Sequence, residues 1–297
     1  MKKIAINGFG RIGRAAFKIA LEHRDTLEVV GVNDLFDTKT LAYLLKYDTV
    51  YGKYAKTVEA VSNALIVDGK SYPVFAEREP QKLPWGKLGV DTVIESTGIF
   101  RTKEQMQLHI QAGAKNVILS APPKGDGVST CVLGVSDIAT DKNICKSAAS
   151  CTTNSVSTPV KIIHERFIIK KALFTTIHAY TADQNLVDGP HKDLRRGRTA
   201  GQNIVPTSTG AAIATTEVIR DLKGKFDGVA LRVPVPAGSI SDVTMLVERK
   251  TTKEEVNEVL EQAAHSAEYK KILSVSREPL VSSDILGSTY SAIIDAE

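Results

Sequence analysis

The sequence predicts an α/β protein of two domains. Residues 1–150 are predicted to form a doubly wound parallel sheet, and residues 151–297 an α+β domain with a mostly antiparallel sheet. Short apolar runs alternate with helical repeats along the first domain, and a glycine-rich turn joins the first run to the first helix. Beyond residue 150 the apolar runs become long and rich in β-branched residues, which indicates a different kind of sheet.

The first domain alternates predicted strands and helices in chain order. They are strand 3–8, helix 14–23, strand 27–34, helix 38–47, strand 91–97, helix 102–113 and strand 115–122. Such alternation indicates βαβ units, and hence parallel strands with helices on both faces. Residues 49–90 break the alternation with short period-two segments, so an antiparallel insertion is expected there.

The second domain opens with a long predicted helix and continues mainly with strands. The amphipathic stretch 153–167 predicts the helix, with Pro159 close to its first turns. Predicted strands follow at 170–181, 228–236 and 239–250, and a predicted helix at 252–267. Long strands of this kind favour a mostly antiparallel sheet packed on helices.

Composition narrows the classes of partner. Lys and Arg number 38 against 34 Asp and Glu, and a net charge of +4 gives no reason to expect nucleic acid. Cys131, Cys145 and Cys151 form no CxxC pair, which argues against a disulfide framework and a metal site and favours a cytoplasmic location. The N-terminus lacks the apolar core of a signal peptide, and no apolar run reaches the ~20 residues of a membrane span, so no membrane partner is expected.

The first glycine-rich turn has the spacing of a dinucleotide-binding motif. Gly8, Gly10 and Gly13 follow a predicted strand and open a predicted helix, where free N–H groups favour a pyrophosphate. Asp34 ends the second strand, where a carboxylate can bind the ribose hydroxyls and repel a 2′-phosphate. NAD is therefore expected rather than NADP, unless Asp34 is only a solvated acid in a turn.

Cys151 is expected at the start of a helix, where the macrodipole and unpaired N–H groups lower the pKa of a thiol. Among the histidines, His23, His109 and His265 fall in ordinary helical patterns and are expected at the surface. His164 lies on the same helix as Cys151 and ~20 Å away, too far to be its base. His178 ends a strand, and is either that base or a structural histidine.

Two further stretches are candidates for binding anions. Residues 206–212 predict a loop that enters a helix, where Thr209 and backbone N–H groups can hold an anion. Arg232 interrupts an apolar strand and needs an anionic partner, which is either a ligand phosphate or a carboxylate such as that of Asp242. The basic run 191–198 is either a solvated loop or a phosphate-facing one.

Taken together, the segments "INGFGRIGR", "SCTTN", "HAYTADQ", "DLRRGR", "PTSTGAA" and "LRVPVP" resemble the phosphorylating glyceraldehyde-3-phosphate dehydrogenases in order and spacing. The resemblance implies oxidation of D-glyceraldehyde 3-phosphate with NAD and inorganic phosphate, in a homotetramer. It implies that Cys151 is the nucleophile, forming a thiohemiacetal and then a thioester, and that His178 is the base. It also implies that residues 179–203 form a loop directed toward a neighbouring subunit.

The resemblance also assigns binding residues. For the phosphate of the substrate it implies Thr181 and Arg232, with Asp183 in support. For the attacking phosphate it implies Ser150, Thr152, Arg196, Thr209 and Gly210. For the cofactor it implies Gly8, Gly10, Arg11, Ile12, Gly13, Asp34, Arg78 and Ser120.

Two alternatives accompany this interpretation. An erythrose-4-phosphate dehydrogenase would share the nucleophile and the base. The family also continues past "STYSAIIDAE" with a further strand and helix that help to hold the nicotinamide, so a shortened, non-catalytic NAD-binding form is the other alternative. The segment "DGP" at 188–190 favours NAD, with use of both NAD and NADP as the alternative.

Overall fold

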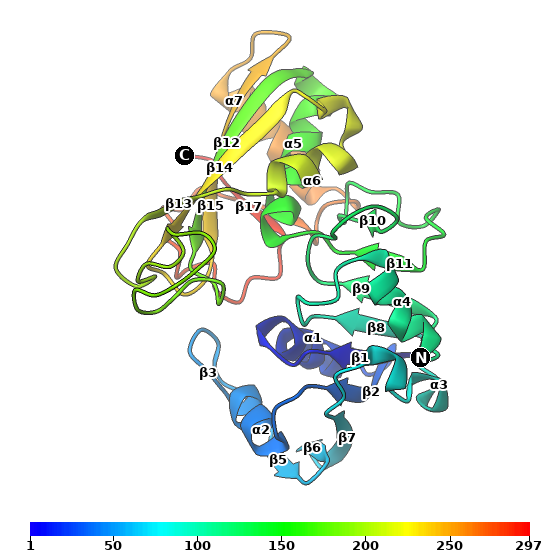
Figure 1. Ribbon diagram of the computed structural model, residues 1–297. Helices are drawn as coiled ribbons and strands as arrows, with labels where there is room; N and C mark the ends of the chain where they lie inside the picture. Colours follow the sequence, from blue (N-terminus) through cyan, green and yellow to red (C-terminus); the bar gives the residue numbers. More distant parts are fainter. The chain divides into compact units, whose positions relative to one another are not determined.

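The computed structural model describes all residues from Met1 to Glu297, and the chain divides into two compact units (Figure 1). The first unit comprises Met1–Cys131 and Ala139–Ala149, and the second comprises Val132–Ile138 and Ser150–Glu297. None of the helices combines the length and the apolar character that a membrane span requires.

The first unit is built on a nine-stranded sheet with the order β10-β11-β9-β8-β1-β2-β7-β6-β5. Its strands are β1 (Lys2–Asn7), β2 (Leu27–Asn33), β5 (Val58–Val61), β6 (Ala64–Val67), β7 (Lys70–Phe75), β8 (Thr92–Glu95), β9 (Asn116–Leu119), β10 (Ser129–Thr130) and β11 (Cys145–Ser147). The seven strands from β10 to β7 pair in parallel, as the alternation of strands and helices predicts. A separate hairpin joins β3 (Tyr47–Asp48) to β4 (Gly52–Lys53).

Helices cover both faces of this sheet. They are α1 (Arg11–Glu22), α2 (Thr38–Lys46), η1 (Pro80–Lys82), α3 (Trp85–Leu88) and α4 (Lys103–Gln111). Successive residues of a strand point to opposite faces. Ile4 and Ile6 of β1 accordingly pack in the cluster formed with α1 and α2, whereas Ala5 packs in the cluster that contains Trp85 of α3 and Met106 of α4. The sheet is therefore doubly wound.

The stretch expected to be an antiparallel insertion joins the main sheet. β5, β6 and β7 pair antiparallel to one another, and β7 then pairs in parallel with β2. This extension places the end of β7 beside the end of β2, where Asp34 donates its backbone N–H to the carbonyl of Phe75 at 3.0 Å.

The second unit is built on a four-stranded sheet with the order β13-β14-β12-β15. The strands are β12 (Ile169–Ala179), β13 (Val205–Thr207), β14 (Phe226–Val233) and β15 (Ser239–Val247), and β16 (Leu273–Ser276) pairs separately with β17 (Ala292–Asp295). β12 pairs antiparallel with β15 and β13 pairs antiparallel with β14, but the central pair of β12 and β14 is parallel. Three segments, β13, α6 (Ala211–Val218) and η2 (Arg220–Leu222), lie between those two strands in the sequence.

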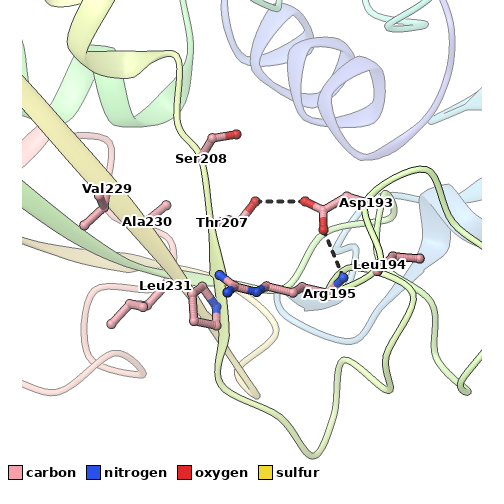
Figure 2. Close-up of a pocket in the computed structure, with 9 residues that line it drawn as sticks. Asp193, Leu194, Arg195, Thr207, Ser208, Val229, Ala230 and Leu231 are labelled. Carbon is pink, nitrogen blue, oxygen red and sulfur yellow. Dashed lines mark hydrogen bonds between the residues drawn. The ribbon is translucent and has the colours of Figure 1, made fainter.

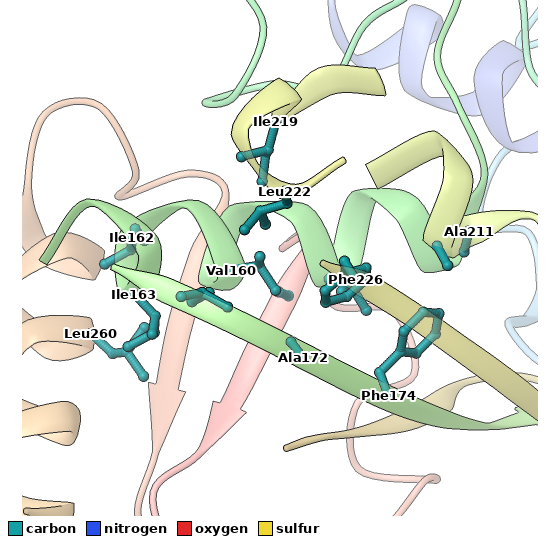
Figure 3. Packing of buried hydrophobic residues seen from close by; sticks show 14 of the residues in the cluster. Val160, Ile162, Ile163, Ala172, Phe174, Ala211, Ile219, Leu222, Phe226 and Leu260 are labelled. Atoms are coloured by element: carbon teal, nitrogen blue, oxygen red, sulfur yellow. The ribbon is translucent and has the colours of Figure 1, made fainter. Parts of the chain in front are cut away.

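One face of this sheet is covered by helices, with α5 (Cys151–Phe167) packed along β12 (Figure 3). Val160 and Ile163 of α5 pack with Phe174 of β12 and Phe226 of β14, whose rings stack at 5.3 Å. α6 and α7 (Lys253–His265) pack against α5. Pro159 lies inside α5, and the helix continues through it to Phe167. The core thus anchors the helix that begins with Cys151.

Candidate functional site

Cys151 is the first residue of α5, and the preceding backbone is held in an unusual conformation. Ala149 has φ +60°, in the left-handed region, and is buried. Ser150 then caps the helix, because its hydroxyl accepts the backbone N–H of Thr153 at 3.0 Å. Cys151 itself is exposed. The local sequence therefore presents a thiol at a helix N-terminus, as expected.

His178 comes from the end of β12 and meets the thiol. Its Nε2 lies 3.3 Å from Sγ of Cys151, and its Nδ1 lies 2.7 Å from the carbonyl oxygen of Ala179. A carbonyl oxygen can only accept, so Nδ1 carries a proton and Nε2 is left to exchange a proton with the thiol. The backbone of β12 thereby fixes the tautomer that a base for Cys151 requires.

The electrostatics of the pair favour charge separation. Although the residue as a whole is exposed, partial desolvation of its thiol raises the pKa of Cys151. The hydrogen bond and charge of His178, with the N–H of Thr152, outweigh this effect, and the net pKa lies below the ordinary value for a thiol. The pKa of His178 is raised, chiefly by its hydrogen bond to Cys151. Burial raises the pKa of Cys131 and of Cys145. Among the three cysteines, Cys151 alone has the properties of a nucleophile.

Arg232 lies beside this pair on the neighbouring strand. The parallel register of β12 and β14 sets Arg232 opposite His178, and its Nη1 donates to the carbonyl of Ala179 at 3.1 Å. Its Nε is buried and has no hydrogen-bond partner. The ion pair with Asp242 considered from the sequence does not form, because Arg232 is on β14 and Asp242 is on β15, with β12 between these two strands. A buried, unpaired guanidinium N–H next to a thiol suits an anionic ligand.

The loop between β12 and β13 forms its own ion-pair cluster. The guanidinium of Arg196 donates to the carboxylate of Asp183 and to the hydroxyl of Thr207, and lies 3.5 Å from Asp193. Arg196 and Asp183, predicted to serve two different phosphates, are thus bound to each other. Thr181 accepts at its carbonyl the N–H of Gln184, and no hydrogen bond joins it to Arg232.

A separate hollow of ≈ 620 Å³ lies where this loop meets β13 and β14 (Figure 2). Asp193 in its wall accepts the backbone N–H of Arg195 at 3.0 Å and the hydroxyl of Thr207 at 3.5 Å. Its lining includes Val229 and Leu231 but neither Cys151 nor His178. The hollow is therefore not the site of the thiol chemistry.

The start of α6 offers a further group of donors. Gly210 caps the helix without a side chain, and no atom lies within 4 Å of the position that a Cβ would take there. The hydroxyl of Thr209 accepts the N–H of Ala211 at 3.1 Å. The loop 206–212 thus enters a helix, as predicted, and its role in binding an anion stays a prediction.

The glycine turn of the first unit is tight, as its spacing predicts. Gly8 has φ +90°, and a Cβ on Gly13 would lie 2.0 Å from the carbonyl oxygen of Gly8. Gly10 caps α1 with no side-chain partner, and no atom lies within 4 Å of where its Cβ would be. An uncapped, unobstructed helix N-terminus fits the pyrophosphate of a dinucleotide.

The other predicted cofactor residues lie around this turn. Asp34 follows β2, and its carboxylate accepts the N–H of Phe9 at 2.7 Å and that of Phe36 at 3.1 Å. Arg11 and Ile12 are exposed in the first turn of α1, and Arg78 is exposed after β7. Ser120 follows β9 and donates its N–H to the carbonyl of Glu95 at 2.9 Å. The predicted cofactor residues thus follow the ends of four strands of the parallel part of the sheet, namely β1, β2, β7 and β9.

Comparison with known proteins identifies the family. Residues 2–103 match the family model described as the NAD binding domain of glyceraldehyde 3-phosphate dehydrogenase, and residues 150–297 match its C-terminal domain. The chain belongs to the glyceraldehyde-3-phosphate dehydrogenase family.

Three relatives illustrate the similarity, each named glyceraldehyde-3-phosphate dehydrogenase. The protein from Thermotoga maritima is 54% identical over 297 residues, which cover 100% of this chain and 89% of the relative. The protein from Borreliella burgdorferi is 51% identical over 99% of this chain and 89% of the relative. The protein from Geobacillus stearothermophilus is 50% identical over 99% of this chain and 88% of the relative.

The family's motifs fall into two sets in the fold. Within the second unit the structure joins Cys151, His178 and Arg232, and separately joins Arg196 to Asp183. The glycines, Asp34 and the end of β9 gather in the first unit. No group of three or more His, Cys, Asp or Glu side chains is arranged to hold a metal ion.

The structure corrects the prediction that His109 lies at the surface. Its side chain is fully buried and contacts the indole of Trp85 and the carboxylate of Glu95. Part of the signal was present in the helix 102–113, because the apolar Met106 precedes His109 by three residues and so lies on the same face of the helix. Glu95, Trp85 and Asn7, which complete this network, were not singled out by the sequence.

Proposed function

We propose that this chain catalyses the phosphorylating oxidation of D-glyceraldehyde 3-phosphate to 1,3-bisphosphoglycerate with NAD, using Cys151 as nucleophile and His178 as base. The observation that carries the proposal is the contact of 3.3 Å between Sγ and Nε2, with a lowered thiol pKa and a raised imidazole pKa. The relatives' shared name supports the choice of substrate.

The chemistry follows from the protonation of the pair. The thiolate of Cys151 adds to the aldehyde carbon, and the resulting oxyanion takes the proton of the His178 imidazolium to give a thiohemiacetal and a neutral imidazole. His178 then removes the hydroxyl proton as the C–H bond breaks and a thioester forms on Cys151. NAD, when bound, supplies the acceptor for the hydride that leaves this carbon. Inorganic phosphate attacks the thioester carbonyl, releasing an acyl phosphate and the thiolate.

Two anion sites around one thiol are required by this reaction. We assign the phosphate of the substrate to Thr181 and Arg232, with Asp183 in support, because Arg232 has an unpaired Nε beside His178. We assign the attacking phosphate to the residues around the two helix N-termini, which are Ser150, Thr152, Arg196, Thr209 and Gly210.

The cofactor site belongs to the first unit in this proposal. Gly8, Gly10 and Gly13 would hold the pyrophosphate and Asp34 the ribose hydroxyls, with Arg11, Ile12, Arg78 and Ser120 around them. Residues 1–150 then constitute the NAD-binding domain and residues 151–297 the catalytic domain. We further propose a homotetramer that works in the cytoplasm.

The test is steady-state NAD reduction with glyceraldehyde 3-phosphate, with and without inorganic phosphate. We expect phosphate-dependent turnover in the wild type and a loss of at least ~10³-fold in Cys151→Ser. Cys131→Ser is the matched control and should retain turnover, since burial and Asp141 raise the pKa of that thiol.

Three other results would each count against part of the proposal. Turnover that does not depend on phosphate would reject the phosphorylating mechanism. Faster turnover of erythrose 4-phosphate would reassign the substrate. Full activity of Cys151→Ser would remove the nucleophile.

A further inference from the structure

A chain of buried polar side chains crosses the first unit and has no role in the function proposed above. Trp85 of α3, His109 of α4 and Glu95 of β8 are all fully buried. The indole N–H of Trp85 donates to Nδ1 of His109 at 3.1 Å, and Nε2 of His109 lies 3.1 Å from Oε2 of Glu95. An indole N–H can only donate, so the proton of the neutral imidazole is on Nε2 and is donated to Glu95.

The hydrogen-bond network that runs from Trp85 through His109 divides at Glu95. Besides the bond from His109, its Oε2 accepts the side-chain amide of Asn7 at 2.6 Å. Its Oε1 accepts the backbone N–H of Thr97 at 2.8 Å and also the hydroxyl of Thr97. Each of these groups donates to the carboxylate, and neither Lys nor Arg is among them, so hydrogen bonds alone hold Glu95 in place. A buried carboxylate is costly unless every such bond is made.

The first branch reaches the glycine turn. Thr97, fixed by Glu95, forms the surface on which Gly8 packs, because a Cβ on Gly8 would lie 2.7 Å from the backbone nitrogen of Thr97. Ser96 donates its hydroxyl to the carbonyl of Gly8 at 2.7 Å. The same carbonyl is the atom against which Gly13 of α1 packs. A shift of the Ser96–Thr97 backbone would therefore be passed to the start of α1.

The second branch reaches the residues beyond β2. The side-chain carbonyl of Asn7 accepts the amide of Asn33 at 2.7 Å. Asn33 in turn donates to the carbonyl of Glu77 and accepts the N–H of Glu77, both at 2.9 Å. Glu77 and Asn33 immediately precede Arg78 and Asp34 in the chain. Both groups of proposed cofactor contacts are thus tied to one buried carboxylate.

We infer that Glu95, oriented by His109 and Trp85, is the positioning residue of the cofactor-binding edge of the sheet. It fixes the Gly8 turn through Thr97, and it fixes Asp34 and Arg78 through Asn7 and Asn33. The two groups of residues proposed to bind the dinucleotide are thereby held in position before the dinucleotide binds. The inference rests on the proposed function in one respect, namely that NAD binds at this edge.

The test combines a measurement on the free protein with one on NAD binding. Glu95→Gln leaves one acceptor where two oxygens faced donors, so we expect amide hydrogen exchange in residues 6–13 and 95–99 to become ~10-fold faster and the Kd for NAD to rise ~10-fold. His109→Leu should act alike. His109→Gln can accept from Trp85 and donate to Glu95, and should restore both values to within ~3-fold of wild type.

The controls separate positioning from general stability. His23→Leu replaces an exposed histidine of the same unit and should change neither measurement. Alkylation of Cys151 should be unchanged in every variant. If Glu95→Gln does not fold, Trp85→Phe removes the indole N–H together with part of a fully buried ring, so a rise of ~3-fold in exchange and Kd is expected along with a lower melting temperature.

Two outcomes have distinct meanings. Variants that melt at lower temperature but keep the wild-type Kd and the wild-type exchange at residues 6–13 would overturn the inference and leave the network a purely structural one. A wild-type protein that does not bind NAD would contradict the proposed function instead, and the exchange measurement alone would then decide whether Glu95 positions the turn.

Discussion

The reactivity of Cys151 depends on the orientation of one imidazole. The carbonyl of Ala179 holds the Nδ1 proton of His178, so that Nε2 faces the thiol. The charge of Arg232 opposes protonation of His178, whereas the partner thiolate favours it. Both shifts favour transfer of the thiol proton to the imidazole, next to a neighbouring cation.

The pH dependence of alkylation tests this pair. The lowered thiol pKa means that iodoacetamide should react with Cys151 in wild type at pH values where an ordinary thiol is protonated. In His178→Asn the midpoint of the rate–pH profile should move up toward ~8.5, and the rate at pH 7 should fall ~10-fold. Mass spectrometry of the modified peptide gives the rate at each pH.

Cys145 provides the internal comparison for that measurement, since burial raises its pKa and it should react far more slowly. A profile for His178→Asn that overlays the wild type would show that the helix N-terminus, and not the imidazole, sets the reactivity of Cys151.

Much of this site could be predicted from residue types, and the rest depended on distant contacts. A cysteine before a helix and a histidine ending a strand identified the pair of Cys151 and His178 as a candidate. The binding of Arg196 by Asp183 could not be predicted, because it depends on how a long loop folds back. The burial of His109 was missed because its partners, Trp85 and Glu95, lie in other elements.

At the scale of elements, the β1–turn–α1 segment shows how close packing and open space alternate along one motif. A Cβ on Gly13 would lie too close to the backbone oxygen of Gly8. A Cβ on Gly10, three residues earlier, would enter open space. The same residue type is thus needed for packing at one position and for ligand access at the other.

Gly13→Ala and Gly10→Ala form a matched pair that separates these needs. Gly13→Ala should lower the free energy of unfolding by about 3 kcal/mol, because the blocking atom belongs to the backbone of Gly8. Gly10→Ala should change it by no more than about 1 kcal/mol, since only the cap preference is affected. Urea denaturation measures both.

NAD titration completes the comparison. Gly10→Ala should weaken NAD binding despite its near-normal stability, because the added methyl would occupy the proposed path of the pyrophosphate. Equal stabilities of the two variants would show that the turn adjusts to a side chain at Gly13.

Element type and order followed from periodicity, whereas strand direction sometimes did not. The helices and strands of residues 1–122 appear where the alternation predicts them, because each is long enough to carry its own pattern. β7 was expected in an antiparallel insertion and also pairs in parallel with β2. Its short period-two pattern is the same for either direction, so only the tertiary structure decides.

For the whole molecule, the central feature is that each unit has its own hydrophobic core. The cluster around Phe174, Leu222 and Phe226 lies wholly in the second unit, and the clusters around Phe17 and Trp85 lie wholly in the first. Trp85 is the only tryptophan of the chain. Its fluorescence therefore reports on the first unit, while circular dichroism reports on both.

A core substitution in the second unit tests whether the two cores unfold separately. Leu222→Ala should destabilise that unit by about 2–5 kcal/mol, because a fully buried leucine is truncated. We expect the transition seen by circular dichroism to broaden or split, and the transition seen by Trp85 fluorescence to keep its wild-type midpoint. Coincident shifts of both signals would show that the chain unfolds as one cooperative body.

The left-handed conformation of Ala149 lowers the stability of the fold and at the same time restricts the backbone that precedes Cys151. A residue with a Cβ pays ~1–2 kcal/mol in that region, and glycine does not. Ala149→Gly would thus remove a torsional penalty and would look attractive in any attempt to make the protein more heat-resistant. Glycine would also loosen the backbone two residues before the thiol, so an engineer who seeks both robustness and turnover should stabilise this chain elsewhere.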